Sequence, residues 1–164
     1  MPLLVFRIEK GKWLQNEILQ EEDPSADAIQ SLRVANNSLS VWEISDESEL
    51  PLIATVLATT FEHLDSFDMV MLDDHSLADR GLKVIATPGE TKYAGMANRH
   101  RDVAGLDYWG LGNLMECTVV GFKAGRVERI RAAQIRDLLK RAIENGSVKI
   151  DDLRPSVQKK VTTS

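Results

Sequence analysis

Apolar residues along this chain either alternate with polar ones or gather in short runs, and this pattern predicts alternating strands and helices. Four runs rich in β-branched and aromatic residues predict strands at 3–8, 39–44, 67–72 and 82–86. Between the second and third of these, apolar residues recur with helical spacing from about 48 to 64. A strand, a helix and a strand in succession predict a βαβ unit over about 39–72, whose two strands run parallel.

The C-terminal part of the chain predicts a hairpin followed by a helix. Residues 117–122 and 126–130 have strand composition and are separated by a short loop that contains glycine. The spacing of apolar residues over 132–144 predicts one helix with a single buried stripe. Residues 156–164 are mostly polar, and we expect them to form a flexible tail.

These elements predict a single α/β domain over 1–155, built on a central mixed sheet. The chain has 164 residues, of which 43% are hydrophobic and 27% charged, as in ordinary soluble globular proteins. The polar stretch 20–27 predicts a loop. No apolar run approaches the roughly 20 residues of a membrane helix, and no secretion signal is recognisable. We therefore expect a cytoplasmic protein that does not contact membranes.

Charge is divided by position along the chain. Residues 1–88 carry 6 Lys and Arg against 16 Asp and Glu, whereas residues 89–164 carry 14 against 9. If this division persists in space, the acidic half of one copy could meet the basic half of another. The preferred hypothesis is therefore a non-enzymatic module that binds a protein partner or itself. Aromatic residues of a glycine-containing segment are candidates for the contact, namely Tyr93, Tyr108 and Trp109.

A rival hypothesis is a small enzyme, or a nucleotide-binding or metal-binding domain, with its site at strand ends. Candidate catalytic residues are Asp73, Asp74, His75, His100 and Asp102, and candidate ligand-binding residues are Thr87, Gly89 and Thr91. However, the chain has no glycine-rich phosphate loop. Capping of a helix by one of the aspartates explains the acidic pair without a metal. We therefore predict neither a metal nor a cofactor.

The single cysteine, Cys117, excludes an internal disulfide. It could act as a nucleophile with His100 as its base and Asp102 as the orienting group. Because it opens an apolar run, we instead expect a buried, inert thiol.

A second alternative is nucleic-acid binding by the basic segment 126–141, through Arg129, Arg136 and Lys140. Acidic residues at i,i+4 spacing and the lack of aromatic residues after 122 favour an ordinary solvated face instead.

Overall fold

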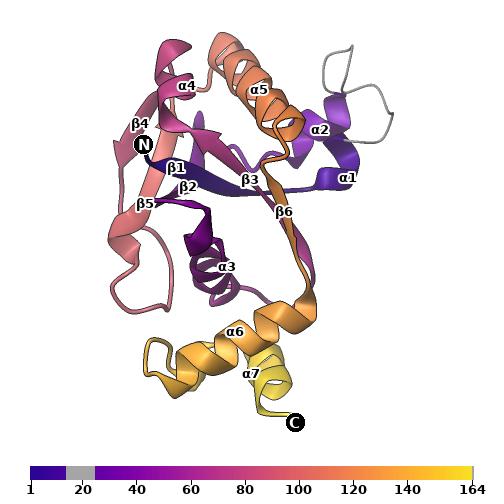
Figure 1. The fold of residues 1–164 in the computed structure, drawn as a ribbon, viewed down its shortest axis with the longest axis vertical. Coiled ribbons are helices and arrows are strands. Elements are labelled where there is room, and N and C mark those ends of the chain that lie inside the picture. The colour runs from indigo at the N-terminus through magenta and orange to yellow at the C-terminus, as the bar shows by residue number, and fades with distance from the viewer. Residues whose placement is uncertain (14–24, 164) are drawn as a thin grey trace.

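The computed structural model describes residues 1–13 and 25–163, so the predicted loop at 20–27 lies mostly outside the described part. Six strands form one sheet in the order β4-β5-β2-β1-β3-β6 (Figure 1). The strands are β1 (Leu3–Ile8), β2 (Ser38–Ile44), β3 (Phe67–Asp73), β4 (Lys83–Ala86), β5 (His100–Ala104) and β6 (Val127–Ile130). The helices are α1 (Lys10–Trp13), α2 (Ala26–Ser31), α3 (Leu50–Ala58), α4 (Asp74–Asp79), α5 (Tyr108–Lys123), α6 (Ala132–Glu144) and α7 (Pro155–Thr162).

Helices cover both faces of the sheet, which confirms the predicted α/β fold (Figure 1). We call the side covered by α3, α6 and α7 the α3 face, and the side covered by α1, α2, α4 and α5 the α5 face. Side chains of β1 alternate between the two faces, as the pleat requires. Val5 packs into the core of the α3 face, whereas Leu4 and Phe6 pack into that of the α5 face.

The predicted mixed sheet is wrong, because every pair of neighbouring strands in the described sheet is antiparallel. Strands β2 and β3 do run in the same direction on either side of α3, as the βαβ prediction requires. However, β1 lies between them and pairs antiparallel with both. The reason is burial: Leu4, Val5 and Phe6 are at most 2% exposed, and only a central strand can bury both of its faces.

The predicted hairpin is also wrong, because residues 117–122 belong to helix α5. The side chain of Asp107 begins this helix by accepting a hydrogen bond from the Gly110 amide at 2.8 Å. Leu114, Cys117 and Gly121 are buried at helical spacing against the sheet. Strand β6 therefore pairs with β3 at one edge of the sheet, rather than with a preceding strand.

The C-terminal residues that we expected to be a flexible tail form helix α7 instead. Pro155 occupies the first turn, where its fixed φ suits a helix. Val157 and Val161, four residues apart, are both buried in the core of the α3 face. Two apolar residues at this spacing are enough to dock a short helix against α6.

Two glycines of α5 should respond oppositely to alanine. A Cβ at Gly121 would lie 3.2 Å from both Leu72 Cδ2 and Met71 O, where α5 crosses β3, whereas a Cβ at Gly112 meets nothing within 4 Å. We expect Gly112→Ala to stabilise the protein by about 0.5–1 kcal/mol. Gly121→Ala should cost about 1 kcal/mol or more through overpacking. Chemical denaturation measures both, and equal stabilisation by the two variants would contradict this packing.

Candidate functional site

The structure gathers Thr87, Gly89 and His100, but as an interior contact. The ring of His100 meets that of Trp42 edge-on, with centroids 5.1 Å apart, and its Nδ1 lies 2.9 Å from Thr87 Oγ1. A Cβ at Gly89 would lie 2.6 Å from His100 Cβ and 2.6 Å from Trp42 Cη2, so this position requires glycine. His100 is 8% exposed. These residues hold the segment after β4 onto the sheet.

Thr91 and Tyr93 likewise hold the end of α3. Thr91 Oγ1 donates to the Val56 carbonyl at 3.1 Å and accepts from the Tyr93 amide at 3.1 Å. Tyr93 is half-buried and packs against the core of the α3 face. Thr59 Oγ1 also donates to Val56 O, at 2.8 Å. These bonds end α3 at Ala58, before the predicted end at about 64.

The acidic cluster after β3 caps a helix. Asp73 accepts from the amide of His75 at 2.9 Å and begins α4, next to Asp74, and His75 pairs with Asp79 at 3.1 Å. The ends of β3 and β4 do lie at the same end of the sheet. However, three strands stand between β3 and β4, which separates them by about 19 Å. The two halves of the rival site therefore do not meet.

No group of metal-ligating side chains that could hold a metal ion occurs among residues 1–13 and 25–163. Asp102 lies on β5, where its carboxylate accepts a long hydrogen bond of 3.4 Å from Ser40. Cys117 packs in the core of the α5 face, whereas His100 meets Trp42 in the α3 face. Because the sheet separates them, the cysteine nucleophile with a histidine base does not form.

The charge division along the chain does not become a division in space. Strands β5 and β6 of the second half join the four strands of the first half in one sheet, and early carboxylates pair with late arginines. Four such pairs are Glu43–Arg101, Glu49–Arg99, Glu62–Arg154 and Asp68–Arg129. These pairs remove part of the charge contrast on which head-to-tail attraction between an acidic and a basic pole would rely. Arg129, which lies on β6, is also separated from the α6 residues Arg136 and Lys140.

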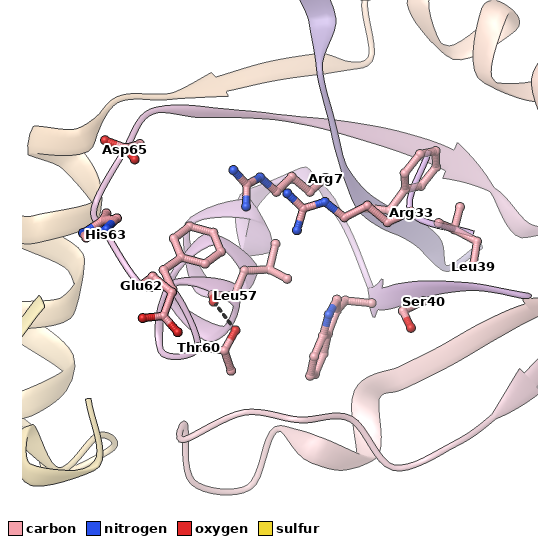
Figure 2. Close-up of a pocket in the computed structure, with 12 residues that line it drawn as sticks. Arg7, Arg33, Leu39, Ser40, Leu57, Thr60, Glu62, His63 and Asp65 are labelled. Atoms are coloured by element: carbon pink, nitrogen blue, oxygen red, sulfur yellow. Dashed lines mark hydrogen bonds between the residues drawn. The ribbon is translucent and has the colours of Figure 1, made fainter. Parts of the chain in front are cut away.

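A different cluster stands out where α3 ends, a cavity that we call the arginine pocket (Figure 2). It has a volume of about 430 Å³ and opens on the α3 face. Strands β1 and β2, the segment before β2 and the segment after α3 form its walls. Its lining residues are Phe6, Arg7, Arg33, Leu39, Ser40, Trp42, Leu57, Thr60, Phe61, Glu62, His63 and Asp65.

Arg7 occupies an unusual position for a cation, on the inner strand β1 one residue before its end. Its neighbours Phe6 and Ile8 are buried on the opposite face. Its guanidinium lies 4.8 Å from the centroid of Phe61 and 5.4 Å from that of Phe67, close enough for cation–π attraction. Burial, and then the positive charge of Arg33, lower the pKa of Arg7, while the negative charges of Glu9 and Asp65 oppose this shift. The group nevertheless stays protonated at neutral pH.

Figure 2 shows the guanidinium groups of Arg7 and Arg33 side by side, extending in the same direction over the pocket. Within the described part of the chain, neither side chain makes a hydrogen bond or a salt bridge. Other arginines of this fold, Arg99 and Arg101 among them, bind carboxylates. Glu62, at the rim of the pocket, is paired with Arg154. Two neighbouring cations thus form no ion pair with any residue in 1–13 or 25–163.

The rest of the pocket combines apolar and polar groups. Leu57, Trp42 and Phe61 supply apolar surface, and Ser40 and Thr60 supply hydroxyls. Two guanidinium forks can bind a carboxylate or a phosphate with paired hydrogen bonds, while the apolar wall covers the rest of a ligand. Sequence reasoning missed both arginines, although an arginine inside the apolar run 3–8 was a signal that could have been read.

No known protein family, curated protein or solved structure matches this chain. None of the helices in the described ranges is long and apolar enough to cross a membrane. The assignment of a function therefore depends on the arrangement of the side chains themselves.

Cys117 should behave as a protected thiol. Burial raises the pKa of this thiol and is the largest influence on it. We expect a disulfide reagent to modify the native protein at least about 100-fold more slowly than the denatured protein, because reaction requires opening of α5. Since the folded-state pKa is the higher one, stability relative to Cys117→Ala should fall as pH rises above about 8.5. Rapid native labelling would contradict this burial.

Proposed function

We propose that this protein binds a small organic anion in the arginine pocket. The observation that carries the proposal is the pair of adjacent guanidinium groups, Arg7 and Arg33, without a partner among the described residues. The ligand class is a carboxylate or phosphate attached to a compact apolar or aromatic body. A cavity of about 430 Å³ is within the range of small-molecule sites.

The cost of this arrangement supports a binding role. Arg7 is half-buried and loses hydration, and the charge of Arg33 opposes its own. Apolar side chains at these positions would avoid both penalties. Sequences tend to break local rules of stability at functional sites. An anion between the two guanidinium groups would turn the repulsion into attraction and complete their hydrogen bonds.

Charge-removing variants test the proposal. Without added anions, the free energy of unfolding of Arg7→Met should be higher than that of the wild type or at most about 1 kcal/mol lower. The reason is that the substitution removes the repulsion between the Arg7 and Arg33 guanidinium groups. In the wild type, an anion at a hundredfold its dissociation constant should add about 2.7 kcal/mol of stability. This gain should be absent in Arg7→Met and in Arg33→Met. Thermal unfolding against a panel of carboxylates and organic phosphates, followed by calorimetry, provides the measurement.

Arg141→Met is the matched control, because it removes the same charge from an exposed position on α6. It should keep the full response to the anion. Equal responses in all three variants, or no response of the wild type to any of these anions, would refute the proposal. Arg33 is exposed, so its variant remains informative if Arg7→Met folds poorly.

A second candidate function is self-association through helix α5, supported by one observation. Tyr108 and Trp109 are 82% and 77% exposed, and their rings stack edge-to-face with centroids 5.1 Å apart. Large aromatic side chains are enriched where proteins meet. This observation replaces the charge division as the support for an interaction module.

Sedimentation of the wild type and Trp109→Ser tests self-association. We expect the wild type to form dimers. The Trp109→Ser substitution should raise the dimer dissociation constant at least 10-fold, as for an interface hot spot. Because the side chain is exposed, the variant should unfold at the same denaturant concentration as the wild type. A wild type that remains monomeric at high concentration would eliminate this candidate.

A further inference from the structure

A second cationic cavity lies between α6 and α7, and we call it the basic niche. Its volume is about 630 Å³. No carboxylate contributes to its lining, which consists of Leu64, Ala132, Ala133, Arg136, Ser156, Lys159, Lys160 and Thr163. In Figure 1 these two helices lie at the end of the molecule opposite α5. None of the residues that line the arginine pocket lines the niche.

Arg136 is incompletely bonded in the niche. The side chain as a whole is 44% exposed. Its Nε, however, is buried and has no hydrogen-bond partner, and it is the only buried side-chain nitrogen or oxygen in this situation among the described residues. The carboxylate nearest to it in the described structure, that of Asp137, is 3.8 Å away, which is too far for a hydrogen bond. A buried polar atom without a partner indicates a group that the protein itself does not supply.

Ammonium groups complete the charge of the niche. Lys159 and Lys160 follow each other on α7, and neither forms a salt bridge within the described ranges. Lys140 Nζ lies 3.5 Å from the carbonyl oxygen of Thr163, which places a further ammonium beside the niche. Three cations from two helices thus line one cavity, and a fourth, Lys140, lies beside it.

We propose that the basic niche binds a phosphomonoester. A phosphomonoester carries a charge of about −1.5 to −2 at neutral pH and three acceptor oxygens, which match one guanidinium and several ammonium groups. A carboxylate carries a single negative charge and would leave most of the positive charge of the niche uncompensated. The small side chains of Ala132 and Ala133 leave the niche open, so the phosphate can belong to a free molecule or to a phosphorylated peptide segment. Recognition of phosphorylated segments by clusters of cationic side chains is a common mode.

A nucleic-acid backbone fits less well. Each phosphodiester carries a single charge, and the chain as a whole has a net charge of −5, which opposes sequence-independent attraction to a polyanion. Moreover, none of the niche residues is aromatic, so bases would find no stacking surface.

The test uses two double variants. The niche variant carries Lys159→Gln and Lys160→Gln together, and the control carries Lys123→Gln and Lys149→Gln. Both pairs remove two charges from exposed positions. The probes are inorganic phosphate, a phosphothreonine peptide, its unphosphorylated form and a DNA duplex. Fluorescence anisotropy follows the labelled peptides and the duplex, and thermal unfolding follows phosphate.

We expect the phosphopeptide or inorganic phosphate to bind the wild type, and the niche variant to bind it at least 10-fold more weakly. The control should bind as the wild type does. In an Arg7→Met background the niche substitutions should weaken binding by the same factor, which separates the niche from the arginine pocket. Stronger binding of the phosphopeptide than of phosphate would identify a peptide as the source of the group. Equal binding of both peptides, preference for the duplex, or no binding of either phosphate compound would overturn the proposal.

Discussion

Burial of the central strands on both faces is the constraint on which the rest of this structure depends. Val5 and Leu4 of β1 enter opposite cores, and Met69 and Val70 of β3 do the same. Strands with two apolar faces cannot lie at an edge or face water. Helices must therefore cover both sides of the sheet, and the amphipathic segments before and after the strands, such as α6, supply them.

The arginine pocket lies where the helical cover of the α3 face ends. Helix α3 ends at Ala58, because the hydroxyl groups of Thr59 and Thr91 both donate hydrogen bonds to the Val56 carbonyl oxygen. Beyond that point β1 continues without a helix above it, and Arg7 occupies the position that an apolar residue would otherwise fill. The cavity is thus a consequence of the end of one helix, and the arginine determines its chemistry.

Local patterns were sufficient to predict most strands, the helix α6 and the capping role of Asp73, because each depends on residues close in sequence. They failed at α5, where Val119 and Val120 mimic a strand while burial follows helical spacing. They also failed for the position of β1, because strand pairing brings together segments that are far apart in the chain. The candidate site was missed for the same reason: only folding brings Arg33 beside Arg7.

The distribution of charge also depends on contacts between segments that are far apart in the chain. Four carboxylates of the first half pair with arginines of the second, two of them across neighbouring strands, so part of the asymmetry is neutralised within the molecule. The arginine pocket and the basic niche are exceptions. A double-mutant cycle between Arg7→Met and Arg33→Met, measured by denaturant unfolding, tests this central claim most directly. The account predicts an unfavourable coupling of about 0.5 kcal/mol or more without anions. With an anion at a hundredfold its dissociation constant the coupling should become favourable, because only the wild type gains the binding free energy. A coupling that is zero or favourable in the absence of anions would contradict it.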